Sequence, residues 1–336
     1  MVTLKDIARE CKVSFSTVSK ALKGSSEISA ETIKTIQEKA AQMGYHPNLA
    51  ARTLRTNRTF DIGVVFEDKT GAGLQHQYFA KILSGFQKVA QEKNYDITFT
   101  SQSNDKPFDY YNHMKGRNFD GVAILSADFD KPGIQTLVQS EIPTVTLDYF
   151  YDNNHTSIMS DNKKGMTELV NFIIENGHKK IAMIHGENTL VTQERINVFK
   201  SICKNNGIET PDEYFAEALY HEPITSGEAT NVLLNLKDPP TCIIYPDDYS
   251  ALGGIREINS RHLTVGKDIS IVGYDGIMLT SMMFPPLTTY EQDGEEIGIR
   301  MAEALISNIE SGSDYKSTQI MVNGRLLKGG TVAKIN

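Results

Sequence analysis

The first 45 residues contain three short stretches with the apolar spacing of amphipathic helices, separated by tight turns. In the first stretch the apolar residues fall at i, i+3, i+4 and i+7, and they are Leu4, Ile7, Ala8 and Cys11. Thr3, Ser14 and Ser29 stand where the three helices would begin, and a hydroxyl there accepts a hydrogen bond from a free backbone N–H group. Three short helices in this order predict a helix-turn-helix unit, a common DNA-binding device.

The second helix is expected to present a polar face, because its apolar residues Val18 and Leu22 turn towards the core. Residues near the start of a recognition helix contact base edges, and hydroxyl groups at helix beginnings contact phosphates. The candidate DNA-binding residues of this unit are Thr3, Ser14, Phe15, Ser16, Thr17, Ser19 and Lys20. Any small helical bundle has apolar stripes, but this polar face favours DNA binding.

Charge is divided unevenly along the chain. Residues 1–58 hold ten Lys and Arg against five Asp and Glu, a balance of +5. Subtraction from the chain totals of 34 and 42 leaves 24 basic against 37 acidic residues, or −13, for the remainder. A basic beginning and an acidic body suit a protein that meets phosphates only at one end.

The three cysteines, Cys11, Cys203 and Cys242, are far apart and show no C-x-x-C spacing. This pattern favours a reducing compartment and predicts neither a disulfide framework nor a zinc site. The sequence does not begin with a signal-peptide pattern, and no apolar run approaches the roughly 18 residues of a membrane span. We therefore expect a cytoplasmic protein without a membrane partner.

From Phe60 onward, short apolar or β-branched runs alternate with amphipathic stretches such as 79–92. The runs are 62–66, 97–100, 122–125, 144–147, 180–186, 241–245 and 269–274. This alternation predicts parallel sheets covered by helices on both faces, and the cycle restarts after Asp161. We therefore expect an α/β body of two doubly wound parallel-sheet subdomains, with ligands bound beyond the carboxyl ends of the strands.

The segments TLKDIA, VSFSTVSKAL, GYHPNLAARTL and, far downstream, PPLTT resemble the lactose-repressor (LacI/GalR) family of bacterial transcription regulators. The resemblance runs from residue 2 to about residue 330 and implies a periplasmic-binding-protein-like body. It implies that the chain crosses between subdomains near Ser160, 288–290 and 321–323. The implied limits are 1–47 for the headpiece, 48–60 for a hinge helix and linker, 61–160 with 291–321 for one effector subdomain, and 161–290 with 322–336 for the other.

The hinge helix implied by this resemblance runs from Asn48 to about Arg55, and in the family it becomes ordered on the operator. Leu54 matches the leucine that inserts into the central base step and bends the duplex. The candidate DNA-binding residues of this segment are Tyr45, Asn48, Ala51, Leu54 and Arg55.

The turn between the first two helices departs from the family, which usually has Ala-Gly where this chain has Cys11-Lys12. A lysine in a left-handed turn position costs about 1–2 kcal/mol relative to glycine, because its Cβ crowds the following carbonyl oxygen. A phosphate contact by Lys12 would recover part of this cost.

Carboxylates follow several predicted strands of the body, where side chains would enter the cleft. Arg195 matches the effector-binding arginine of the family, although Val198 replaces the glycine usual three residues later. Phe79 is equally compatible with simple helix packing, and Asp248 with a helix cap. The candidate effector-binding residues are Asp68, Tyr78, Phe79, Asp148, Arg195, Tyr220, Asp247 and Asp275.

Several carboxylates facing one arginine suit a neutral polyol better than an acid, and family members often carry Asn where this chain has Asp247. We therefore expect a sugar-type effector. Gly71-Ala72-Gly73 lacks the third glycine of a dinucleotide fingerprint, and the histidines are scattered without metal-binding spacing. Adjacent carboxylates such as Asp247 and Asp248 rarely flank a glycosidic bond at about 5–9.5 Å. We expect no enzymatic activity, no cofactor and no metal.

These observations together predict a homodimeric transcriptional repressor that binds a pseudo-palindromic operator and responds to a small effector. Tetramers of the family that this chain resembles carry an extra leucine-rich tail, and this sequence ends at RLLKGGTVAKIN without such a repeat, so the resemblance implies a dimer. Two alternatives remain. The effector could instead be a phosphoprotein or a nucleobase, or the chain could be a sugar-binding module without a regulatory role.

Overall fold

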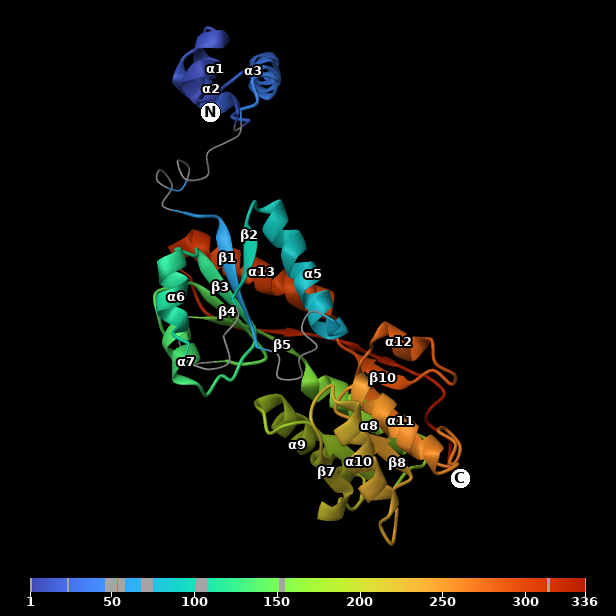
Figure 1. Cartoon of the computed structure of the whole chain (residues 1–336). Coiled ribbons are helices and arrows are strands. Elements are labelled where there is room, and N and C mark those ends of the chain that lie inside the picture. Colours follow the sequence, from blue (N-terminus) through green and yellow to red (C-terminus); the bar gives the residue numbers. More distant parts are fainter. Residues whose placement is uncertain are drawn as a thin grey trace. The chain divides into compact units, whose positions relative to one another are not determined.

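The computed structural model describes residues 2–22, 24–45, 53, 58–67, 75–100, 108–150, 155–312 and 315–335. The chain divides into two compact units, residues 1–59 and 60–336 (Figure 1). Five candidate residues lie outside the described residues, and they are Asn48, Ala51, Leu54, Arg55 and Asp68.

The described residues up to Tyr45 in the first unit form three helices, each begun by a hydroxyl side chain. The helices are α1 (Leu4–Glu10), α2 (Phe15–Ala21) and α3 (Ala30–Gln42). The side chains of Thr3, Ser14 and Ser29 accept hydrogen bonds from backbone N–H groups in the first turns of these helices. The expected caps are therefore confirmed. The buried core of the unit is Ile7, Ala8, Val18, Ala21, Ile36 and Ala40.

The turn between α1 and α2 places Lys12 in the left-handed region, with φ of 55°. The expected strained position is thus confirmed, and the backbone turn does not require glycine. Val13 N donates to Ala8 O at 3.0 Å, which ties the turn back onto α1.

The second unit contains two six-stranded sheets, sheet A and sheet B. Sheet A has the order β11-β5-β4-β3-β1-β2, and all its strands are parallel. Its strands are β1 (Asp61–Phe66), β2 (Asp96–Thr100), β3 (Gly121–Ser126), β4 (Thr144–Leu147), β5 (Thr156–Ser160) and β11 (Gln319–Val322). Helices α5 (Gln77–Glu92) and α13 (Gly294–Ser311) pack on one face, while α6 (Tyr110–Arg117) and α7 (Pro132–Val138) cover the other.

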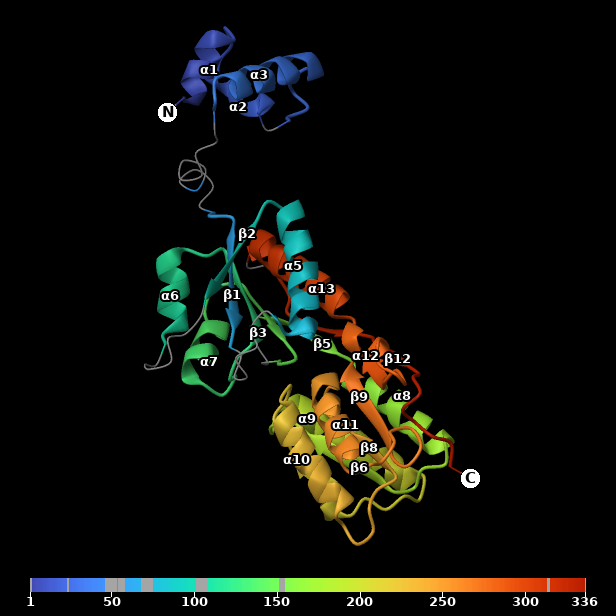
Figure 2. The same ribbon diagram turned by 45° about the vertical axis from the view of Figure 1, so that its right-hand side comes forward.

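Sheet B has the order β12-β10-β9-β8-β6-β7. Its strands are β6 (Ile181–His185), β7 (Phe215–Glu217), β8 (Cys242–Ile244), β9 (Ser270–Asp275), β10 (Thr288–Glu291) and β12 (Arg325–Leu327). Only β12 runs antiparallel to its neighbour, so the expected parallel sheet ends in one antiparallel edge strand. Helices α8 (Asn162–Glu175) and α9 (Leu190–Asn205) pack on one face, and α10 (Pro223–Leu234) and α11 (Asp248–Ser260) on the other (Figure 2).

The chain passes between the sheets three times, after β5, after β10 and after β11. The described residues of this unit also include two short helical elements, a 3₁₀ turn at Asp212–Tyr214 and α12 (Met278–Ser281). The limits of the subdomains given above stay predictions. Among the helices of the described residues, none has the length and apolar character to cross a membrane.

Glycines bring α5 and α13 into close contact on sheet A. A Cβ atom on Gly298 would lie 1.9 Å from Ile82 O, and one on Gly85 would lie 2.1 Å from Glu295 O. No side chain fits at either position, so the two helix backbones approach directly. This packing fixes the beginning of α5, which lines the cavity described below.

Replacing Gly298 with alanine tests this contact. Gly298→Ala is expected to lower the free energy of unfolding by about 1–3 kcal/mol, because the added methyl group forces the helices apart. Gly116→Ala in α6 is the matched control, since nothing lies within 4 Å of the added Cβ. It should stabilise the protein by up to about 1 kcal/mol through helix propensity. Urea denaturation measures both, and equal effects of the two changes would contradict the close helix contact.

Candidate functional site

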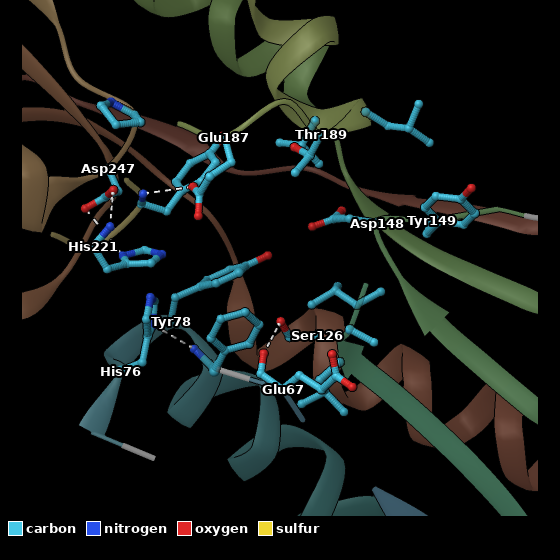
Figure 3. A pocket seen from close by; sticks show the side chains of 18 of the residues that line it. Glu67, His76, Tyr78, Ser126, Asp148, Tyr149, Glu187, Thr189, His221 and Asp247 are labelled. Carbon is cyan, nitrogen blue, oxygen red and sulfur yellow. Dashed lines mark hydrogen bonds and ion pairs between the residues drawn. The ribbon is translucent and has the colours of Figure 1, made fainter. Parts of the chain in front are cut away.

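A cavity of about 280 Å³ lies between the carboxyl ends of the strands of the two sheets, where the sequence predicts ligand binding. Every described effector candidate lines it, and these residues are Tyr78, Phe79, Asp148, Arg195, Tyr220, Asp247 and Asp275. Figure 3 shows Asp148 and Tyr149 on one side of the cavity, His221 and Asp247 on the other, and Tyr78 between them. The structure brings these residues together, and their role in ligand binding stays a prediction.

Asp148 follows β4 in a left-handed conformation, with φ of 54°. Its Oδ1 accepts a hydrogen bond from Ser160 N at 3.0 Å, and its own N–H donates to Ile158 O at 2.9 Å. Enclosure in the cavity wall raises the pKa of Asp148 to about 6, although the hydrogen bond from Ser160 and the charge of Arg195 act in the opposite direction.

Asp275 ends β9 with φ of 107°, which is also unfavourable for a residue other than glycine. Its side chain is 5% exposed, and its Oδ1 accepts a hydrogen bond from Gln292 Nε2 at 2.6 Å. Burial raises the pKa of Asp275 to about 6, against the lowering effect of His221 and Arg195. Asp148 and Asp275 therefore bind protons more readily than ordinary carboxylates.

Arg195 on α9 is buried and held from several sides. Its Nε donates to Asn162 Oδ1 at 2.8 Å and its Nη1 donates to Pro246 O at 3.0 Å. Its guanidinium carbon lies 3.7 Å from the ring centre of Tyr274, a cation–π contact. Two of the three guanidinium nitrogens are thus bonded to the protein, which orients the cation in the cavity wall.

The helix cap expected from Asp248 is supplied by the residue before it, at the start of α11. Asp247, not Asp248, caps the helix, since its Oδ1 accepts from Ser250 N at 2.9 Å. The carboxylate of Asp248 instead accepts hydrogen bonds from Ile277 N and Thr289 Oγ1, inside the subdomain. The expectation that Asp248 caps this helix was therefore wrong, because Asp248 is the first residue of the helix and its carboxylate is bonded to Ile277 and Thr289.

Asp247 is ionised more readily than its two neighbours in the cavity. Burial alone would raise its pKa, but the His221 side chain and hydrogen bonds from His221 N and Ser250 N lower it to about 2. His221 N lies 2.9 Å from Asp247 Oδ2. This carboxylate is thus saturated with donors from the protein.

Two polar atoms of the cavity wall have no hydrogen-bond partner among the described residues. They are the hydroxyl oxygen of Tyr78 and Oε1 of Gln292, and both are buried. Buried polar groups are nearly always hydrogen-bonded, so such atoms mark places where a ligand or water completes the site. Tyr78 was predicted from sequence, but Gln292 was missed because it lies between a strand and a helix without any motif.

Sequence reasoning also missed an aromatic pair and two histidines. Phe129 and Tyr149 stack with ring centres 4.4 Å apart and line the cavity. His76 and His221, set aside as scattered, both line the cavity and contact each other. Their separation in sequence gives no signal of this contact. Among the described residues, no three His, Cys, Asp or Glu side chains are grouped to hold a metal ion.

The expected DNA-binding face of the first unit is accessible only in part. The Phe15 side chain is 50% exposed, and Ser16 is exposed beside it. Lys20 forms an ion pair with Glu27, so its charge is engaged within the unit. Tyr45 packs against the helical core and is only partly exposed. The contacts of these residues with DNA stay predictions.

The protonation of Asp275 predicts an unusual dependence of stability on pH. Its pKa is about 6 in the folded chain against an ordinary 3.8, so the folded state holds more protons between pH 4 and 6 and loses stability as pH rises through this range. Asp275→Asn removes the charge but keeps the acceptor for Gln292. We expect it to raise the free energy of unfolding at pH 7 by about 1–3 kcal/mol, measured by urea denaturation.

Two comparisons test whether the charge of Asp275 is the cause of this change in stability. The stabilisation by Asp275→Asn should shrink at pH 4, where the wild-type carboxyl group is already neutral. Asp247→Asn should have the opposite effect at pH 7, because the lowered pKa of Asp247 means that its ionised form stabilises the fold. A stabilisation by Asp275→Asn that is equal at both pH values would contradict the electrostatic explanation.

Comparison with known proteins identifies both units. Residues 3–48 match "Bacterial regulatory proteins, lacI family" and residues 170–332 match "Periplasmic binding protein-like domain". The chain is 32% identical to "Probable HTH-type transcriptional repressor ExuR" of Bacillus subtilis (strain 168), over 100% of this chain and 99% of that protein. It is 30% identical to "Catabolite control protein A" of Priestia megaterium, over 88% of this chain and 89% of that protein.

A solved structure, the lac repressor dimer bound to operator and the anti-inducer ONPF, has a TM-score of 0.80 with this chain. The two are 24% identical, and the match covers 99% of each chain, which confirms the predicted fold class. The resemblance found in the sequence is confirmed as well. The chain belongs to the lacI family of bacterial regulatory proteins, and its function is that of a DNA-binding transcriptional regulator.

Proposed function

We propose that this regulator is a repressor whose DNA binding is controlled by a neutral sugar held in the cavity. The observation that carries this proposal is the pairing of two proton-binding carboxylates, Asp148 and Asp275, with one buried cation, Arg195. Sugar hydroxyls would donate hydrogen bonds to these carboxylates and accept one from the unpartnered hydroxyl of Tyr78. Such bonds favour the ionised carboxylate.

The cavity wall also discriminates by charge and shape. Asp247 is ionised beside the cavity, so an anionic ligand would meet repulsion there. The stacked rings of Phe129 and Tyr149 offer an apolar surface to the carbon face of a sugar ring. A cavity of about 280 Å³ is small for a ligand site, which suits one sugar ring better than a long oligosaccharide.

The regulator would act as a homodimer in the cytoplasm on a pseudo-palindromic operator, with one headpiece on each half-site. A ligand in the cavity would contact both subdomains and so change their relative orientation. Through the hinge segment, this change would alter the affinity for DNA. Thermodynamic linkage requires operator binding to change ligand affinity by the same factor. The DNA contacts would come from the start of α2 and from the segment that includes Leu54.

The effector class is tested by thermal melting of the protein against pentoses, hexoses, sugar acids, disaccharides and nucleobases. A ligand at 100 times its Kd stabilises the folded state by about 2.7 kcal/mol, which raises the melting temperature measurably. We expect a neutral monosaccharide to give the shift. A shift with a sugar acid or a nucleobase would contradict the charge argument, and a flat panel would favour a phosphoprotein partner instead.

Tyr78→Phe tests the site itself. The change removes a hydroxyl that has no partner among the described residues, so the free protein should keep its stability or gain slightly. Affinity for the sugar found above, measured by calorimetry, should fall by about tenfold, because one hydrogen bond is worth roughly 1–1.5 kcal/mol. Tyr111→Phe is the control, since Tyr111 lies on α6 and does not line the cavity. Unchanged affinity in Tyr78→Phe would remove Tyr78 from the binding site.

The hinge segment is tested by Leu54→Ala on an operator selected from random DNA. We expect the free energy of operator binding to become weaker by about 1–3 kcal/mol. The reason is that the apolar side chain that inserts between bases and stabilises the bent duplex is lost. Sugar affinity of the free protein should not change. Fluorescence anisotropy of labelled DNA measures the effect, and wild-type operator affinity in this variant would refute the insertion of Leu54.

A further inference from the structure

Of the three ion pairs within the described residues up to Tyr45, one includes a candidate DNA-binding residue. Lys20, in the last turn of α2, donates a hydrogen bond from Nζ to Glu27 Oε2 and forms an ion pair with it. Ser16 lies one turn earlier on the same face of the helix and is exposed. The side chains of Lys20 and Glu27 are 45% and 66% exposed, so both are accessible from solvent.

The other two ion pairs lie elsewhere in the unit. Arg9–Asp6 lies within α1, and Lys39–Glu10 joins α3 to α1. Neither involves the helix that is expected to enter the major groove, so the pair on α2 is the one whose charges DNA would meet there. Surface ion pairs add little to stability, so a structural role is a weak explanation for this pair.

The turn after α2 holds Glu27 in place beside the end of the helix. Gly24 has φ of 69°, a conformation that favours glycine, and it lets the chain turn back towards α2. Ser25 N then donates to Lys20 O at 3.1 Å, and Ile28 N donates to Ser25 O at 3.1 Å. Ile28 packs against the core of the unit. Glu27, between these two anchored residues, is therefore positioned by the backbone and not only by its ion pair.

We propose that Lys20 and Glu27 act together as a base-reading pair, which recognises one G·C base pair in each half-site of the operator. In the major groove guanine presents two acceptors, N7 and O6, and cytosine presents one donor, the N4 amino group. An ammonium group has three donors, and a carboxylate has only acceptors. Lys20 would donate to guanine and to Glu27, while Glu27 would accept from the cytosine amino group. The inference rests on the proposed contact of α2 with DNA.

Glu27 would contribute mainly by excluding the other base pairs. A carboxylate near DNA is repelled by the phosphates, and a hydrogen bond from an amino group offsets this cost. Where another base presents an acceptor in place of the cytosine amino group, the carboxylate faces a second electron-rich atom and loses its donor. A repulsive element of this kind raises specificity without raising affinity for the correct site.

The ion pair would also limit the contacts of Lys20 with phosphates. An unpaired lysine binds the backbone of any DNA sequence, because phosphate contacts carry no sequence information. The carboxylate of Glu27 engages one donor of the ammonium group and opposes the approach of a phosphate. The pair would thus lower binding to unrelated DNA while it keeps the contact with guanine.

The experiment begins with operators selected from random DNA by the full chain. Fluorescence anisotropy then measures affinity for the selected operator and for versions with each other base pair at each position, all at one salt concentration. The position read by Lys20 is the one whose preference is lost in Lys20→Ala. We expect G·C there in the wild type, and replacing it should weaken binding by about 10- to 100-fold.

Glu27→Gln is the decisive variant, because the amide keeps the size of the side chain but has both donors and an acceptor. At the position read by Lys20, the preference for G·C should fall by about tenfold, because an amide accepts both kinds of partner. Preferences at all other positions should not change. Affinity for unrelated DNA should rise, since one negative charge is removed.

Glu38→Gln is the matched control. It removes the same charge from an exposed residue of α3 that lies outside the three ion pairs. Any effect on affinity should be equal for all sequences, so the preference for G·C should stay at the wild-type value. Each preference is a ratio between two DNAs bound by the same protein, and any effect of bound effector on the overall affinity therefore cancels.

The outcomes separate this inference from the proposed function on which it rests. If Lys20→Ala changes the preference at no position, the contact of α2 with base edges is refuted. If Lys20→Ala removes a preference, but that position is not G·C or Glu27→Gln keeps the full preference, the base-reading pair alone is overturned. A uniform change in affinity for all sequences in Glu27→Gln would likewise reduce Glu27 to a general charge effect and overturn the proposal.

Discussion

The direct backbone contact between α5 and α13 is the constraint from which the architecture of the site follows. Gly85 and Gly298 let the two helices approach until no side chain fits between them. Because α13 in turn packs across sheet A, the beginning of α5 has one position relative to the strand ends. Tyr78 and Phe79 therefore face the cavity, and His76 and Lys81 reach the other subdomain.

Some residues that line the cavity have unfavourable backbone conformations, and some have carboxyl groups that are unfavourable in the charged form. Asp148, His221 and Asp275 all have positive φ values, each of which costs on the order of 1–3 kcal/mol for a residue other than glycine. Two of the same residues carry carboxyl groups whose pKa is raised to about 6. A ligand that supplies hydrogen-bond donors to these carboxylates would relieve the electrostatic part.

Arg195 is held by one subdomain and acts electrostatically on a carboxyl group of the other. Its bonds to Asn162 and Pro246 and its stacking on Tyr274 belong to the subdomain of sheet B. Its charge lowers the pKa of Asp148, which follows β4 of sheet A. The charges of one subdomain thus act on the groups of the other across the cavity. The ionisation of Asp148 therefore depends on a residue of the other subdomain.

Features that depend on near neighbours in the chain were determined by the sequence alone. The caps at Thr3, Ser14 and Ser29 and the alternation of strands and helices are of this kind, because hydrogen bonds and side-chain periodicity act within a few residues. The ends of parallel strands also meet at one edge. The positions of Asp148, Asp247 and Asp275 at the cavity were for this reason predictable.

Tertiary structure alone decided the contacts between distant residues. The pairs His76–His221 and Phe129–Tyr149 join segments that no local pattern relates, and the antiparallel pairing of β12 depends on where the last crossing leaves the chain. That Asp247 and not Asp248 caps α11 is a matter of one helical position, which sequence patterns do not resolve. Burial in the folded chain, not residue type, raises the pKa values of Asp148 and Asp275, since only the assembled fold withdraws these carboxyl groups from water.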